Sequence, residues 1–78
     1  MPQGVRMLDE WIEYFEALRR ARAVVLVKWD GERSRDVYTF VITRQDTDFI
    51  FRRDTDDLPA AIAEGVEKFW AAHPDAAA

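Results

Sequence analysis

The chain has 78 residues, enough for one small domain, and 49% of them are hydrophobic, with three Trp, five Phe and two Tyr. This composition is too apolar for a disordered chain, and without Cys and with a single His it leaves no disulfide and no Cys/His metal site. The net charge of −4 argues against binding driven by nucleic-acid phosphates, which usually requires a strong basic footprint.

Residues 8–22 have the spacing of an amphipathic helix. The apolar side chains recur at i, i+3 and i+4 and define one face, and Tyr14 lies at its edge. Acidic residues come early in this segment and arginines come late, which complements the helix dipole. Glu16 and Arg20 are spaced to form a favourable i,i+4 pair. The apolar face consists of Leu8, Trp11, Ile12, Phe15 and Leu18.

Three strands are predicted next, at Ala23–Trp29, Arg35–Thr43 and Asp48–Arg53, from β-branched and aromatic enrichment and from alternation. The Asp30-Gly31 pair between the first two is typical of a tight hairpin in which both turn positions have positive φ. The second connection, Arg44–Thr47, has no Gly, so its turn type stays open.

The last predicted element is a helix that begins near Asp56 and Asp57. Asp is a good N-cap, and Pro is tolerated in the first turn, where Pro59 stands. Gly65 costs a helix about 1 kcal/mol relative to Ala, so we expect it to mark a close approach to another element. Pro74 ends the helix. The apolar stripe consists of Leu58, Ile62, Val66 and Phe69, with Trp70 beside it.

The order helix–strand–strand–strand–helix predicts an α+β two-layer sandwich with a three-stranded antiparallel meander. Double-stranded-RNA-binding domains share this order, but their second helix begins with lysines that meet phosphates. Here the sequence Asp54-Thr55-Asp56-Asp57 stands in that place with the opposite charge, so the chain is not assigned to that family.

Both faces of the predicted sheet are apolar. If both hairpin loops contain an even number of residues, alternation puts an aromatic-rich set on one face and an aliphatic set with basic residues on the other. An odd first loop would exchange Val24 and Leu26 with Val25 and Val27, which leaves both faces apolar. Either one helix covers each face, or both helices cover the aromatic face and leave the aliphatic face for a partner or a second copy. The aromatic face carries Ala23, Val25, Val27, Trp29, Tyr38, Phe40, Ile42, Phe49 and Phe51. The candidate partner-binding residues of the aliphatic face are Val24, Leu26, Lys28, Arg35, Val37, Val41, Ile50 and Arg52.

No segment indicates secretion or a membrane span. Residues 1–6 lack the apolar stretch of a signal peptide, and the longest apolar run, Ala23–Val27, is far short of the ~20 residues that cross a bilayer. The lack of Cys suits a reducing compartment. We therefore expect a cytoplasmic protein that folds as one domain over residues 1–78, with flexible ends at 1–6 and 74–78.

Catalytic chemistry finds little support. The one Ser, Ser34, and the one His, His73, are far apart in sequence, and His73 is expected at a helix end. The carboxylates between Asp46 and Asp57 lack the spacing of a calcium loop, and the three glycines are too isolated to form a phosphate loop. We predict no enzyme activity, no cofactor and no metal.

A small acidic protein-binding module is the function that these features favour. In size and charge the chain is similar, as a class, to phage-encoded anti-CRISPR proteins and toxin-immunity proteins, which act as inhibitors; no motif carries this resemblance. It implies a partner with a basic, nucleic-acid-handling surface, met by acidic helices. The acidic candidates are Glu13, Glu16, Asp56, Asp57, Glu64 and Glu67.

Two alternatives stay open. One is a homodimeric structural or adaptor domain that pairs through the sheet. The other is a regulator that binds nucleic acid through arginines around the sheet, although acids interleave with them. The arginine set is Arg33, Arg35, Arg44, Arg52 and Arg53.

Overall fold

The computed structural model describes residues 2–77, with side chains described for residues 9–76. The elements are α1 (Pro2–Arg20), β1 (Val24–Trp29), β2 (Tyr38–Arg44), the 3₁₀ turn η1 (Gln45–Thr47), β3 (Phe49–Thr55), α2 (Leu58–Ala72) and the 3₁₀ turn η2 (Pro74–Ala77). The strands form one antiparallel sheet in the order β1-β2-β3. The predicted α+β order and strand meander are thereby confirmed.

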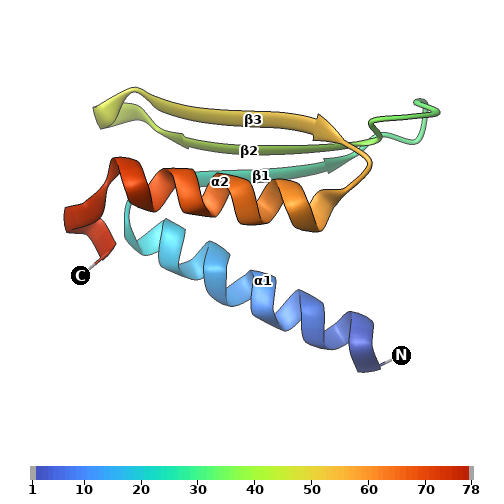
Figure 1. Cartoon of the computed structure of the whole chain (residues 1–78), viewed down its shortest axis with the longest axis horizontal. Helices are drawn as coiled ribbons and strands as arrows, with labels where there is room; N and C mark the ends of the chain where they lie inside the picture. The colour runs from blue at the N-terminus through green and yellow to red at the C-terminus, as the bar shows by residue number, and fades with distance from the viewer. Residues whose placement is uncertain (1, 78) are drawn as a thin grey trace.

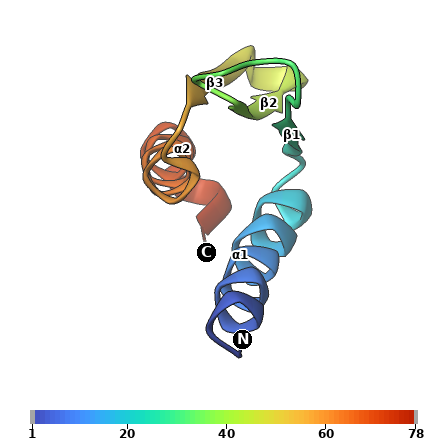
Figure 2. The same ribbon diagram turned by 90° about the vertical axis from the view of Figure 1, so that its right-hand side faces the viewer.

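Both helices lie on the same side of the sheet (Figure 1). The end-on view in Figure 2 shows the sheet as an upper layer, with α2 below β3 and α1 descending from the β1 edge. Of the two arrangements that the sequence left open, the structure has the one in which the opposite face of the sheet is uncovered.

The strand register fixes which residues share a face. Val25 pairs with Ile42 and Val27 with Phe40, and on the other side of β2 Ile42 pairs with Phe51. Because side chains alternate along a strand, these residues point together toward the helices. Phe40 and Ile42 are fully buried there, as are Leu18 of α1 and Phe69 of α2. The aromatic face predicted from alternation is therefore the core face.

Gly65 marks the closest approach of α2 to the sheet. A Cβ at this position would lie 2.8 Å from ring atoms of both Phe40 and Phe51. This is closer than real Cβ atoms come to a neighbour, so only a residue without a side chain lets the helix pack at this height. The close approach expected from the sequence is confirmed.

The β1–β2 connection differs from the predicted tight hairpin. Gly31 does not have a positive φ, and the connection runs over residues 30–37 rather than 30–33, with β2 beginning at Tyr38. Asp36 adopts the left-handed conformation, with φ of 52°. That conformation interrupts the extended backbone, so Arg35 lies in the loop and not in the strand.

Smaller differences concern element ends. α1 begins at Pro2 rather than near Leu8, which agrees with the tolerance of a first helical turn for Pro. β3 extends to Thr55. Asp57 caps α2 as predicted, because its carboxylate accepts a hydrogen bond from the Ala60 N–H. The flexible ends expected at 1–6 and 74–78 stay a prediction; Met1 and Ala78 lie outside the described residues.

Candidate functional site

The uncovered face of the sheet is a grid of three cross-strand rows. The register places Val24 beside Thr43 and Ile50, then Leu26 beside Val41 and Arg52, and finally Lys28 beside Thr39 and Asp54. We call these nine residues the open face. It is apolar at one end and charged at the other, since the rows run from aliphatic to ionic side chains.

The apolar end of the open face leaves large side chains in water. Val24, Leu26 and Ile50 are 65%, 55% and 69% exposed, whereas Val41 in the middle strand is half-buried by its neighbours. Isolated exposed apolar residues are common on protein surfaces, but a group of them on one flat sheet face is typical of an interaction site.

At the charged end of the open face, the Asp54 carboxylate contacts several neighbouring side chains. The Thr39 hydroxyl donates to Asp54 Oδ1 at 2.6 Å, and Arg52 and Arg33 approach the same oxygen at 3.5 and 3.9 Å. The hydrogen bond from Thr39, followed by the two arginine charges, lowers the pKa of Asp54 although partial burial opposes the shift. Asp54 is therefore ionised at neutral pH, and its charge attracts both arginines.

Two predicted members of the face lie outside the strands. Arg35 is exposed in the loop before β2. Val37 precedes β2, where its carbonyl accepts from the Asp30 N–H at 2.8 Å and its N–H donates to Asp56 Oδ1 at 3.2 Å. The structure thus brings together Val24, Leu26, Lys28, Val41, Ile50 and Arg52, six of the eight candidates.

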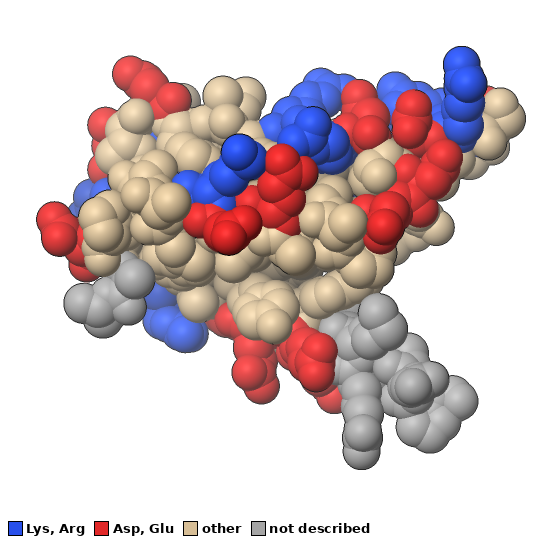
Figure 3. Space-filling model, viewed as in Figure 1, with Lys and Arg blue, Asp and Glu red and all other residues tan. Residues whose placement is uncertain are grey.

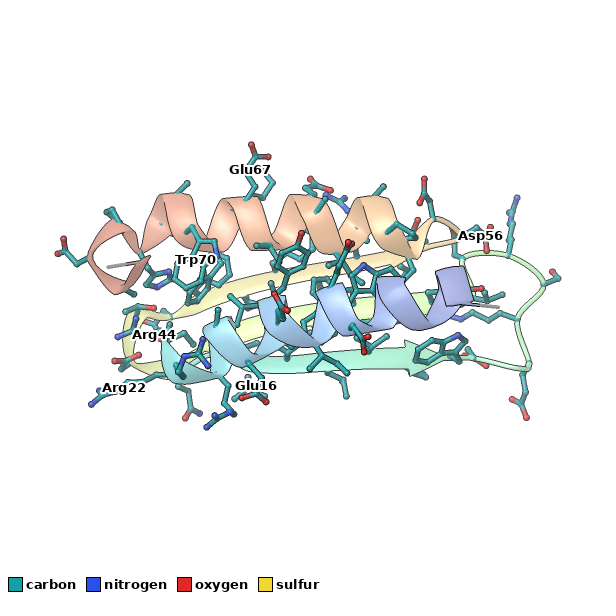
Figure 4. All side chains as sticks on the ribbon, turned by 90° about the horizontal axis from the view of Figure 1, so that it is seen from below. Glu16, Arg22, Arg44, Asp56, Glu67 and Trp70 are labelled. Carbon is teal, nitrogen blue, oxygen red and sulfur yellow. The ribbon has the colours of Figure 1, made fainter. Side chains whose placement is uncertain are left out.

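The acidic candidates do not form one surface. Figure 4 places Glu16 and Glu67 on opposite sides of the molecule. Glu16 binds Arg19 at 2.8 Å rather than the expected Arg20, and Glu64 binds Arg53 at 2.6 Å. Glu13 and Glu67 are exposed on α1 and α2. At the start of α2, Asp56 accepts a hydrogen bond from the Val37 N–H and Asp57 accepts one from the Ala60 N–H.

The arginine set is largely occupied by acids. Arg33 lies 3.3 Å from Asp30, and Arg44 lies 2.8 Å from Asp46. Together with Arg52 and Arg53, four of the five arginines are paired with carboxylates of this chain. Figure 3 shows the resulting mixture of basic and acidic side chains along the sheet side of the molecule. A phosphate would have to compete with these carboxylates for each guanidinium.

The β1 strand presents an unpaired edge. The hydrogen bond from Asp30 N–H to the Val37 carbonyl fixes the alternation along the β1–β2 ladder. It follows that Val24, Leu26 and Lys28 bond to β2, whereas the backbone groups of Val25, Val27 and Trp29 point outward. The same alternation leaves residues 50, 52 and 54 outward on β3.

The two edges are flanked differently. Arg52 and Asp54 stand along the β3 edge, and charges of this kind discourage strand pairing. Five of the six large apolar side chains that are exposed among residues 9–76 belong instead to α1 and β1. They are Ile12, Tyr14, Val24, Leu26 and Trp29.

His73 has a structural place at the end of α2. Its Nδ1 donates to the Phe69 carbonyl at 2.9 Å, and its Nε2 lies 2.7 Å from the Thr47 hydroxyl. The ring stacks on Phe69 at a centroid distance of 4.3 Å. Both ring nitrogens are engaged, as expected for a histidine at a helix end. In the described part of the chain no group of three or more His, Cys, Asp or Glu could hold a metal ion.

A pocket of about 470 Å³ lies on the helix side of the sheet, at the end where α2 begins. Trp11, Trp29 and Tyr38 line it together with Asp56 and Asp57. The sequence prediction placed Trp29 in the core, but this side chain is 65% exposed. Trp29 is the last residue of β1 and adjoins a charged loop, and this position indicates the edge of the core rather than its centre.

Comparison with known proteins adds no family. None of the family models, the curated proteins or the solved structures matches this chain. Among residues 2–77, no helix has the length and the apolar character needed to cross a membrane.

Proposed function

We propose that this protein is a non-enzymatic binding module that engages another protein through the open face. The observation that carries the proposal is the exposure of Val24, Leu26 and Ile50 on a sheet face that neither helix covers. Burying one large aliphatic side chain contributes about 1.5–3 kcal/mol, so three of them can anchor a partner. The Lys28, Arg52 and Asp54 end would supply orientation rather than affinity.

The partner that we propose has a basic, nucleic-acid-handling surface, so that the protein acts as an inhibitor of the anti-CRISPR or toxin-immunity kind. The net charge of −4, with a net −5 in residues 54–78, supports this part of the proposal. Opposite net charge accelerates encounter at low salt. Reversing Glu64 and Glu67, or Glu13 and Glu16, to Lys should slow association at low salt and have little effect at high salt.

The test of the open face is affinity capture from the native host with three baits. These are the unaltered chain, a Leu26→Ser/Ile50→Ser variant, and a Glu67→Gln variant that changes only exposed helix surface. The proposal expects a protein that the first and third baits retain and the second loses, with binding of the purified partner weakened at least about tenfold, or 1.4 kcal/mol. Equal retention by the open-face variant would show that the interface lies elsewhere.

A homodimer through the β1 edge is the second candidate. The unpaired Val25, Val27 and Trp29 backbone groups and the exposed apolar residues on α1 and β1 favour it. Two copies paired antiparallel along β1 would form a continuous six-stranded sheet and leave the charged β3 edges outside.

Proline substitution at matched edge positions tests this dimer. Val27→Pro removes an outward N–H of β1, and Arg52→Pro removes an outward N–H of β3, so neither breaks the bond to β2. Sedimentation at micromolar concentration should show a dimer for the unaltered chain and for Arg52→Pro, and a monomer for Val27→Pro and for Leu26→Lys. A monomer in every case would remove this candidate and leave the open-face proposal standing.

A further inference from the structure

The pocket on the helix side combines aromatic walls with an acidic rim. Trp29 and Tyr38, neighbours across the β1–β2 ladder, stand edge-to-face with centroids 6.0 Å apart and planes at 89°. Trp11 of α1 also lines the pocket. Three rings drawn from α1, β1 and β2 therefore meet at one hollow, which is separate from the open face because it lies on the opposite side of the sheet.

Two carboxylates lie at the same hollow, on the turn that leads into α2. Figure 4 shows Asp56 at the end of the molecule where the sheet, the loop and the start of α2 come together. The pKa of Asp56 is held below its ordinary value by the Asp36 and Val37 N–H groups and by the charge of Arg35, so the group is an anion at neutral pH. Asp57 uses Oδ1 to cap α2 by accepting from the Ala60 N–H.

Aromatic rings beside carboxylates favour a ligand that combines a positive charge with apolar surface. The faces of Trp and Tyr rings attract cations electrostatically, and more strongly where water is displaced. Asp56 and Asp57 add full negative charges at the rim, which also offset the positive end of the α2 dipole. A neutral apolar ligand would gain affinity from the rings but not from the carboxylates. A strongly hydrated small ion would gain little affinity from the rings.

The volume fits a side-chain-sized ligand. About 470 Å³ falls within the ordinary range of small-molecule sites, about 300–1,000 Å³. Trp29 is 65% exposed, so a ligand lying against it would remove apolar ring surface from water.

We propose that this pocket binds an alkylammonium or guanidinium group, carried either by a small free amine or by a Lys or Arg side chain of a protein partner. The proposal stands on the pocket itself and does not depend on a partner for the open face. If both hold, the two surfaces act from opposite sides of the sheet and can be inactivated separately.

Tryptophan fluorescence can report on the pocket directly. Two of the three tryptophans, Trp11 and Trp29, line it, whereas Trp70 packs against Phe69. In a Trp70→Phe background the signal therefore comes from the pocket alone. The probes are choline, its uncharged isostere 3,3-dimethyl-1-butanol, and the N-acetyl methylamides of lysine and arginine, titrated at constant ionic strength because exposed charges are screened by salt.

The expected result is saturable binding of at least one cationic probe, with the uncharged isostere at least about tenfold weaker. Trp29→Ala and Asp56→Asn should each weaken binding by about three- to thirtyfold, in line with the loss of one ring or one charge. Because Trp29→Ala removes a pocket fluorophore, its titration is followed by chemical shifts. Glu67→Gln, which removes the same charge from the far side of α2, should change nothing.

The comparison between probes also identifies which kind of molecule carries the cationic group. Tighter binding of the amino-acid amides than of choline assigns the pocket to a protein side chain, and the reverse order assigns it to a quaternary amine. Equal affinity for choline and its uncharged isostere would overturn the proposal, as would equal weakening by Asp56→Asn and Glu67→Gln. No saturation by any cationic probe up to tens of millimolar, with the fold intact by circular dichroism, would overturn it as well.

Discussion

On the helix-covered face of the sheet, Phe40 and Ile42 are fully buried, whereas on the opposite face Leu26 and Ile50 leave more than half of their surface in water. Large apolar side chains stand on both faces of the same three strands, although the open face also carries Lys28, Arg52 and Asp54. Which of the apolar side chains are buried depends on the placement of the two helices. The covered face carries the buried core, whereas large apolar side chains of the open face stay exposed.

The largest expected effect comes from two isoleucines on opposite faces. Ile42 is fully buried and Ile50 is 69% exposed. Ile42→Ala should lower the free energy of unfolding by about 2–5 kcal/mol, because it removes apolar contacts and leaves a cavity. Ile50→Ala should change it by less than about 0.5 kcal/mol.

Urea unfolding followed by circular dichroism measures both isoleucine variants. If the Ile42→Ala variant does not fold, Ile42→Val still distinguishes the two faces, because it should lower the free energy of unfolding by about 0.5–1.5 kcal/mol. Similar losses for Ile42→Ala and Ile50→Ala would mean that the open face is covered in solution, for example by a second copy.

A second effect concerns how closely α2 sits on the covered face. In an exposed helix, replacing Gly by Ala is stabilising by about 1 kcal/mol. Gly65→Ala should have the opposite sign, with a loss of about 1–3 kcal/mol, because its Cβ would lie 2.8 Å from the rings of Phe40 and Phe51. A rise in thermal midpoint on this substitution would show that α2 can move away from the sheet at no cost.

The smallest effect tests the charged end of the open face. The pKa of Asp54 is lowered from its ordinary value of 3.8, mainly by the Thr39 hydroxyl. Because the pKa is lower in the folded state, the carboxylate stabilises the fold above about pH 3.8, and this contribution is lost as the pH falls through the folded pKa.

Thr39→Val removes the donor, so the pKa of Asp54 should move back toward 3.8. Carboxyl ¹³C titration by NMR measures this shift, and Glu67→Gln serves as the control in which Asp54 keeps its lowered pKa. An unchanged Asp54 titration in Thr39→Val would assign the shift to Arg52 and Arg33 instead.

Much of the fold could be predicted because it rests on local patterns. The alternation of Tyr38, Phe40 and Ile42 identified the core face, since a strand turns successive side chains to opposite sides. Asp57 and Pro59 located the start of α2 through capping chemistry. The hairpin predicted around Asp30-Gly31 is present, but its tight turn is not, because Asp36 rather than Gly31 takes the left-handed conformation and the loop is longer.

The candidate sites depended more on tertiary structure. Six open-face residues followed from alternation, but Arg35 and Val37 fell outside when β2 began at Tyr38. The hydrogen bond between Thr39 and Asp54 joins residues that are paired only through the register of β2 and β3. The residues that line the aromatic pocket come from α1, from both strands of the first hairpin and from the start of α2. No local sequence spacing therefore predicts it.

The element order and the presence of apolar residues on both sheet faces follow from local patterns in the chain, because periodicity and capping act within a few residues. The placement of both helices on the same face is set by long-range packing instead. That choice depends on the direction in which the chain leaves Arg20 and Thr55 and on the close packing that Gly65 permits against Phe40 and Phe51. The open face is the physical consequence, because both helices lie on one side of the three-stranded sheet and the aliphatic side stays exposed.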